Sequence, residues 1–130
     1  IWLVVDMAYP ATNIPAMAGA DCLNTTQTYP QKTRWEMLDP EGEYEDIYNR
    51  YCHIRASLGS KTMLELVSTD YVEVTLSPED LKKLNIRYIV STNDFDEKIA
   101  AGTTNIFTDS GIEFQKYYEG TQLSIYGCVY

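Results

Sequence analysis

The sequence predicts one α+β domain with a mixed β-sheet, and three observations lead to this fold class. Residues 71–92 have the pattern of a strand, a short capped helix and a second strand. Near the C-terminus, segments 103–108, 112–118 and 123–129 have strand composition and are separated by turn residues, which predicts antiparallel strands. A chain of 130 residues with 45% hydrophobic and 22% charged residues is typical of a single compact domain. We therefore treat residues 1–130 as one domain.

The unit 71–92 specifies its own conformation most clearly, and we expect the rest of the chain to be organised around it. Its first part, Tyr71–Leu76, alternates apolar and polar residues, which is the period of a strand with one covered face. Its last part, Ile86–Val90, is rich in β-branched and aromatic residues and is expected to form a buried strand.

The residues between these two strands predict a short helix with defined ends. Ser77 is expected to cap its N-terminus, with Pro78 at the first helical position, where no N–H is needed. Asp80 lies three residues after Ser77 and completes a capping box. Asn85 is expected to end the helix in the left-handed conformation.

Residues 1–6 (IWLVVD) are expected to form a strand covered on both faces. Asp6 would emerge at its C-terminal end, where α/β folds place ligand-binding groups, and is therefore a candidate ligand-binding residue. The alternative is that Asp6 only forms a turn. Asp21–Thr26 is expected to be a short strand, and its Asn24-Thr25-Thr26 triplet matches the N-glycosylation sequon.

The middle of the chain predicts one loop, one helix and one hairpin. Prolines and a glycine punctuate Tyr29–Gly42, so we expect a loop that Trp35 anchors to the core. Tyr44–Arg50, continued by Tyr51, has apolar residues at i, i+3, i+4 and i+7, which predicts an amphipathic helix. Lys61–Val67 is expected to form a hairpin with the strand that starts at Tyr71.

The charge of the chain excludes two classes of partner. The net charge is −9 and the isoelectric point is near 4.4. Binding to nucleic acid or to an anionic lipid surface needs clustered lysine and arginine, which an acidic chain of this kind does not supply.

Cysteine, metal and cofactor chemistry are weakly represented. Cys22, Cys52 and Cys128 allow at most one disulfide, in any of three pairings, and none has CxxC spacing. We expect them to be small buried residues.

No motif of a phosphate-binding loop, a nucleophile elbow, a zinc protease or an EF-hand occurs, so no catalytic residue, metal or cofactor is predicted. The single histidine, His53, follows Cys52 directly, and neighbouring strand residues face opposite ways, so this pair is not a catalytic couple.

One polar cluster is a candidate ligand-binding site. Asn49, Arg50, Tyr51 and His53 are close in sequence, and charge-assisted hydrogen bonds from Arg50 and His53 would hold a phosphate or a carboxylate. In the alternative, Arg50 pairs with a loop acid such as Asp39, and His53 bonds to a backbone carbonyl. The full candidate set adds two earlier residues, Asp6 and Trp35.

The aromatic composition suggests a second kind of ligand. The chain has 11 tyrosines and two tryptophans, Trp2 and Trp35. An aromatic face with a polar tip stacks well on a sugar ring. The alternative is that these residues belong to the core and to the sheet.

The order of several motifs resembles a known group of membrane proteins. The motifs are Tyr48–Tyr51 (YNRY), Leu76–Ser91 (LSPEDLKKLNIRYIVS) and the closing Leu123–Tyr126 (LSIY). Together they are similar to the C-terminal extracytoplasmic domain of bacterial polytopic membrane proteins related to GT-C glycosyltransferases, including the YfhO-like proteins. The resemblance covers most of the chain, but its motifs are structural, and no catalytic residue of the family maps onto this sequence.

The resemblance implies a non-catalytic domain on the extracytoplasmic face of the bacterial cell membrane. Its partner would be the membrane-embedded part of its own parent chain, which in that family uses a polyprenyl-phosphate sugar donor. The domain would assist acceptor recognition or cover the membrane active site in cell-surface glycosylation. The strand-like start at Ile1 agrees with excision from a longer protein. Two alternatives stay open, namely an independent module that binds a glycan or surface polymer, and a small carboxylate-dependent hydrolase.

Overall fold

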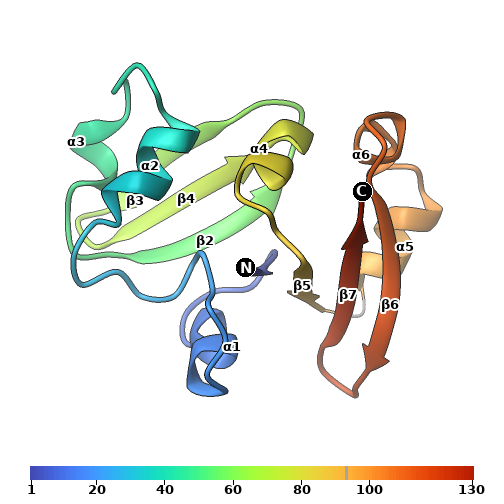
Figure 1. Cartoon of the computed structure of the whole chain (residues 1–130). Helices are drawn as coiled ribbons and strands as arrows, with labels where there is room; N and C mark the ends of the chain where they lie inside the picture. The colour runs from blue at the N-terminus through green and yellow to red at the C-terminus, as the bar shows by residue number, and fades with distance from the viewer. Residues whose placement is uncertain (93) are drawn as a thin grey trace.

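The computed structural model describes residues 1–92 and 94–130 and confirms the α+β fold (Figure 1). The strands form two mixed sheets, with orders β1-β5-β7-β6 and β2-β4-β3. The strands are β1 Trp2–Val4, β2 His53–Leu58, β3 Met63–Ser68, β4 Tyr71–Leu76, β5 Tyr88–Ser91, β6 Glu113–Glu119 and β7 Ser124–Val129. The helices are η1 Ala11–Asn13 (a 3-10 turn), α1 Ile14–Met17, α2 Lys32–Leu38, α3 Glu45–Tyr48, α4 Pro78–Lys83, α5 Asp94–Ala100 and α6 Asn105–Asp109.

The β2-β4-β3 sheet has one covered face, as the alternation in β4 predicts. β4 pairs parallel with β2 and antiparallel with β3, which confirms the hairpin. Val72, Val74 and Leu76 of β4 are buried, and α2 and α4 lie over the sheet (Figure 1). The intervening residues of β4 are partly exposed on the opposite face.

The β1-β5-β7-β6 sheet carries its helices on one face. β1 and β5 are parallel, whereas β7 is antiparallel to both β5 and β6. Phe95 of α5 packs against Phe114 and Tyr126, at ring-centroid distances of 5.4 and 4.6 Å. Phe107 of α6 lies 5.8 Å from Phe114. These aromatic contacts attach α5 and α6 to the C-terminal hairpin.

The end of β1 joins the two sheets. The backbone N–H of Val5 donates to Val90 of β5 at 2.8 Å, and the N–H of Asp6 donates to Ala56 of β2, also at 2.8 Å. Val5 and Ala56 form a parallel bridge. The chain then turns at Asp6, which adopts a left-handed φ of 57°. Residues on both sheets therefore share one hydrophobic core.

The side chain of Asn24 completes this junction. Its amide oxygen accepts from the Val4 N–H at 3.0 Å, and its amide nitrogen donates to the carbonyls of Val4 at 2.8 Å and Ile54 at 3.3 Å. The amide thus replaces a strand residue between β1 and β2. Asn24 has no exposed surface, so its sequon is inaccessible to a glycosylating enzyme in the folded domain.

The predicted helix signals of the central unit are confirmed. Ser77 and Asp80 form a capping box, and Asp80 Oδ2 accepts from the Ser77 backbone N–H at 2.8 Å. Asn85 ends the helix with a φ of 52°. The unit nevertheless connects two sheets, because β4 and β5 belong to different ones.

Three predicted elements are wrong or shorter. Tyr29–Gly42 contains α2 instead of being only a loop, because Trp35 and Leu38 lie on one helical face and are buried. Residues 103–108 do not form a strand, because Phe107 enters the core from the helix α6. The helix expected at Tyr44–Arg50 is the single turn α3.

The strand expected at Asp21–Thr26 is also wrong. Only Cys22 pairs, in an isolated parallel bridge with Trp2. The backbone then leaves the sheet, since the Asn24 side chain makes the bonds that a continuing strand would make.

We expect Asn24→Ala to lower the free energy of unfolding by about 2–5 kcal/mol, since each buried group left unpaired costs roughly 1–3 kcal/mol. Urea denaturation followed by circular dichroism measures this change. Asn49→Ala, at an exposed position, is the control and should change the free energy by less than about 0.5 kcal/mol. Equal effects of the two substitutions would contradict the role assigned to Asn24.

Candidate ligand-binding site

Arg50 is held by backbone carbonyls in the structure. Its Nε donates to Ile47 at 2.8 Å, Nη1 to Thr69 at 3.0 Å and Nη2 to Asp46 at 2.8 Å. The guanidinium therefore ties the end of α3 to the turn between β3 and β4. Asp39, the expected partner, instead accepts from the backbone N–H groups of residues 43 and 44.

His53 lies among aromatic rings at the start of β2. Its ring centroid is 4.1 Å from Tyr9 and 5.6 Å from Tyr51. Its Nδ1 is 3.1 Å from the hydroxyl oxygen of Thr26. Tyr51 is half exposed, so this cluster presents an aromatic surface, and a joint ligand site of Arg50 and His53 stays a prediction.

The other three candidate residues are dispersed. Trp35 stacks on Tyr48 at 4.8 Å and donates its indole N–H to Gln27 at 2.7 Å. Asn49 lies at a separate hollow beside α3. Asp6 forms an ion pair with Lys98 of α5. Trp35, Asn49 and Asp6 each line a different pocket, so their assignment to one ligand site stays a prediction.

Exposed tyrosines are the most conspicuous surface feature. Seven of the eleven are exposed, whereas only Tyr48 and Tyr126 are buried. Five of the eleven, Tyr71, Tyr88, Tyr117, Tyr118 and Tyr126, lie in strands, which agrees with the sheet part of the alternative given above. The exposed ones are Tyr9, Tyr29, Tyr51, Tyr88, Tyr117, Tyr118 and Tyr130.

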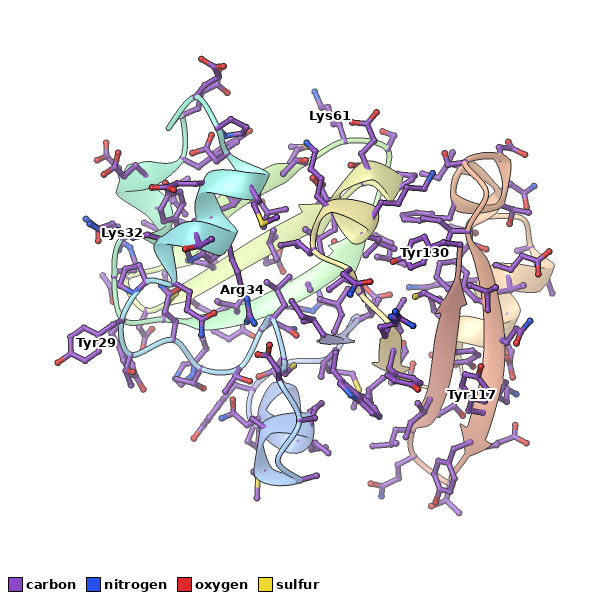
Figure 2. The ribbon with its side chains drawn as sticks, in the orientation of Figure 1. Tyr29, Lys32, Arg34, Lys61, Tyr117 and Tyr130 are labelled. Atoms are coloured by element: carbon purple, nitrogen blue, oxygen red, sulfur yellow. The ribbon has the colours of Figure 1, made fainter. Side chains whose placement is uncertain are left out.

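Four aromatic residues form a row on the face of the β1-β5-β7-β6 sheet opposite α5 and α6. We call this set, Trp2, Tyr88, Tyr117 and Tyr118, the aromatic row. Trp2 and Tyr88 are register partners with ring centroids 4.7 Å apart, and Tyr88 lies 6.1 Å from Tyr117. Tyr118 pairs with Ile125, which packs on this same face with Trp2. Figure 2 labels Tyr117 on the C-terminal hairpin.

Gly127 makes room for the aromatic row. It is the β7 partner of Tyr88, between β5 and β6. A Cβ at residue 127 would lie 2.0 Å from Cε2 of Tyr117, so the Tyr117 ring occupies the space of the missing side chain. The register shift between Lys116 and Tyr118 lets neighbouring tyrosines of β6 serve one face. No local sequence pattern predicts this arrangement.

The helix-covered face behind the aromatic row is held by a polar network. The Tyr126 hydroxyl donates to Asp96 Oδ1 at 2.9 Å, and Lys116 forms an ion pair with the same carboxylate. The hydrogen bond from Lys116 lowers the pKa of Asp96. Burial and the bond to Asp96 raise the pKa of Tyr126 to about 12. This network connects α5 to the hairpin that carries Tyr117.

The cysteines have no nucleophilic character. All three are free and buried. Burial raises the pKa of Cys52 to about 11 and that of Cys128 to about 12, and it also raises the pKa of Cys22. A thiol must ionise to attack or to bind a metal, so none of these is activated near neutral pH. Residues 1–92 and 94–130 contain no group of three or more His, Cys, Asp or Glu placed to hold a metal ion.

Comparison with known proteins places the chain in a family. A family model described as a domain of unknown function, DUF7654, matches residues 1–130. The chain belongs to the DUF7654 family. No curated protein and no solved structure matches it.

No helix in the described part of the chain is long and apolar enough to cross a membrane. Sequence reasoning noted the tyrosines, Trp2 and Trp35 as possible sugar-stacking residues, but it did not identify Tyr88, Tyr117 and Tyr118 as neighbours. Their proximity depends on strand pairing, which the local sequence does not encode.

We expect the DUF7654 domain to lose stability as pH rises from about 9 to about 12. The thiols and Tyr126 have folded-state pKa values above their ordinary values of 9.0 and 10.0. Their stabilising contribution is therefore complete below pH 9 and is lost as pH rises through the folded pKa values. Urea denaturation across this range measures the loss, and Tyr126→Phe should reduce its slope above pH 10. A flat profile up to pH 12 would refute the expectation.

Proposed function

We propose that this DUF7654 chain is a non-catalytic extracytoplasmic domain of a bacterial membrane glycosyltransferase-like protein. In that protein it binds the glycan acceptor during cell-surface glycosylation. Its partners are the membrane-embedded part of its parent chain and the acceptor glycan.

The observation that carries this proposal is the aromatic row. Tyr88, Tyr117 and Tyr118 expose 38, 63 and 55% of their surface, although aromatic side chains gain about 0.5–1.5 kcal/mol from packing with another ring beyond simple burial. Aromatic rings with hydroxyl tips offer apolar area for the C–H faces of a sugar and hydrogen bonds for its hydroxyl groups. A net charge of −9 disfavours a polyanionic ligand.

Two features support a binding role over catalysis. The buried thiols are protonated near neutral pH. The carboxylate of Asp96 has a lowered pKa because Lys116 donates to it, whereas a carboxyl that acts as a catalytic acid needs a raised pKa. The lowered pKa of Asp96 makes this carboxylate unsuited to be the acid of a carboxylate-dependent hydrolase.

An independent glycan-binding module would use the same aromatic row. The two possibilities differ in what the parent gene encodes. We expect the reading frame upstream of Ile1 to encode several apolar segments of about 20 residues, the length that spans a membrane. Translation of that reading frame tests this. An upstream region without such segments would refute the membrane part of the proposal and leave the independent module.

The aromatic row itself is tested by glycan binding. We expect the double substitution of Tyr88 and Tyr117 by alanine to weaken binding of neutral oligosaccharides about fivefold or more, because each ring contributes roughly 0.5–1.5 kcal/mol. Gly127→Ala should weaken binding as well, since its Cβ displaces Tyr117. Calorimetric titration with oligomers of glucose, mannose, galactose and N-acetylglucosamine gives the affinities.

Tyr51→Ala is the matched control, because Tyr51 is similarly exposed but belongs to the His53 cluster. Its affinity should equal that of the unmodified protein. Loss of binding in Tyr51→Ala, with binding kept in the double variant, would move the site to the cluster around Asn49–His53.

A further inference from the structure

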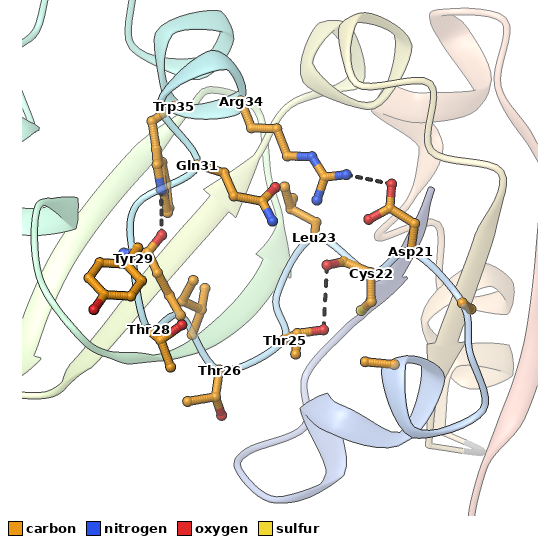
Figure 3. Close-up of a pocket in the computed structure, with 14 residues that line it drawn as sticks. Asp21, Cys22, Leu23, Thr25, Thr26, Thr28, Tyr29, Gln31, Arg34 and Trp35 are labelled. Atoms are coloured by element: carbon orange, nitrogen blue, oxygen red, sulfur yellow. Dashed lines mark hydrogen bonds and ion pairs between the residues drawn. The ribbon is translucent and has the colours of Figure 1, made fainter.

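A second candidate site is the pocket between α1, α2 and the segment 20–29 (Figure 3). Its volume is about 220 Å³. Apolar side chains of Leu23, Trp35 and Ile54 contribute to its lining, together with the guanidinium of Arg34. The residues of the aromatic row do not line it, so this pocket is a separate feature of the molecule.

Arg34 has an unused hydrogen-bond donor in this pocket. Its Nη2 pairs with Asp21 Oδ2 at 2.5 Å, and its side chain is only 18% exposed. Its Nη1 is buried and has no hydrogen-bond partner among residues 1–92 and 94–130. A guanidinium stays charged in proteins and cannot remove this donor by losing a proton. A buried donor of this kind needs an acceptor, which a ligand in the pocket would supply.

The remaining lining supplies both donors and acceptors. Thr25 and Thr28 contribute hydroxyl groups and Gln31 an amide. Figure 3 shows the Gln31 side chain between those of Trp35 and Arg34. Thr28 and Gln31 are exposed at the surface. Groups that both donate and accept suit a ligand rich in hydroxyl groups, since each hydroxyl also does both.

The charge balance favours an uncharged ligand. The carboxylate of Asp21 pairs with the only cationic group of the pocket lining, so the lining has no net charge. The chain as a whole carries −9 and repels anions over the Debye length. A sulfate, phosphate or uronate would therefore meet an already neutralised guanidinium in a repulsive field.

The size and the rim of the pocket favour a single ring. A volume of about 220 Å³ lies below the roughly 300–1,000 Å³ of pockets for drug-sized ligands. Tyr29 lines the pocket and is 84% exposed, and Figure 2 shows its ring pointing outward. Such a ring is free to stack on the part of a ligand that protrudes.

We infer that this pocket binds one uncharged, hydroxyl-rich sugar ring, with Arg34 Nη1 donating to a ring or hydroxyl oxygen. The inference rests on the proposed function for the choice of a glycan, and it adds a site that recognises a single sugar unit. Arg34, Gln31 and the threonines would select the unit, whereas the aromatic row binds without such directed hydrogen bonds.

The two tryptophans allow the two sites to be measured separately. Trp35 lines the pocket and Trp2 belongs to the aromatic row, so their indole N–H signals in a ¹H–¹⁵N NMR spectrum report on different sites. Trp2→Phe assigns the two signals. We expect the methyl glycosides of glucose, galactose, mannose or N-acetylglucosamine to shift the Trp35 signal saturably. Sodium chloride at about 0.5 M screens interactions between exposed charges. It should leave the affinity unchanged, because the ligand is uncharged.

Substitutions identify the group that binds. Arg34→Lys keeps a cation for Asp21 but lacks the forked donor, and should weaken binding at least tenfold. Gln31→Ala should also weaken sugar binding. Because Gln31 is exposed, this variant replaces Arg34→Lys as the test if Arg34→Lys fails to fold. Arg55→Lys is the matched control, because Arg55 also pairs with an acid, Glu73 at 3.2 Å, and does not line the pocket. Its affinity should stay unchanged.

Three results would overturn the inference. They are an unchanged Trp35 signal with all four glycosides, unchanged binding in both Arg34→Lys and Gln31→Ala, and tighter binding of methyl glucuronide or inorganic phosphate than of the neutral sugars. If oligosaccharides shift only the Trp2 signal, the pocket inference fails while the proposed function stands. If they shift neither signal, both fail.

Discussion

The structure depends on the junction at the end of β1, where the backbone bonds to both sheets. Val5 and Asp6 donate backbone hydrogen bonds in opposite directions, to β5 and to β2. One residue earlier, the Asn24 amide satisfies both backbone groups of Val4 and reaches the carbonyl of Ile54. Unpaired backbone groups at this depth would be strongly unfavourable. The residues at the end of β1 and directly after it therefore join the two sheets.

Both candidate binding surfaces are built on the edges of this strand. Trp2 of β1 starts the aromatic row through its contact with Tyr88. On its other side, the Trp2 backbone bonds to residues 21 and 23, which flank the wall of the pocket that contains Arg34. β1 therefore positions both the pocket and the aromatic row. Both surfaces are supported by buried backbone rather than by loops alone.

Arg50 and Arg34 differ in how their hydrogen-bond donors are used. Arg50 donates from Nε, Nη1 and Nη2 to backbone carbonyls and ties α3 to a turn. Arg34 pairs with Asp21 through Nη2, whereas its Nη1 is buried beside a pocket without a hydrogen-bond partner among the described residues. The two arginines therefore differ in their hydrogen bonding because of their surroundings. Arg50 stands out in the sequence because it lies close to His53, whereas no sequence pattern singles out Arg34 in α2.

Interactions between residues that are close in the sequence determine a large part of the secondary structure. The capping box of Ser77 and Asp80, the left-handed Asn85, the alternation of β4 and the β3–β4 hairpin all follow from residues within a few positions of one another. These features depend on short-range hydrogen bonds and on side-chain period, which a sequence displays directly. The α+β class follows from them as well.

The remaining helices, the arrangement of the sheets and the candidate sites depend on tertiary structure. The N-termini of α2 and α6 have no side-chain cap, and these helices form because Trp35 and Phe107 are buried in the core that both sheets share. Neither the two-sheet arrangement nor the use of Asn24 as a strand substitute has a local signal. The aromatic row and the unpaired Nη1 of Arg34 arise from the same cause, since long-range strand pairing and burial select which of many similar residues become neighbours. The sequence alone determined the elements with their own start and stop signals, and tertiary packing determined the sites.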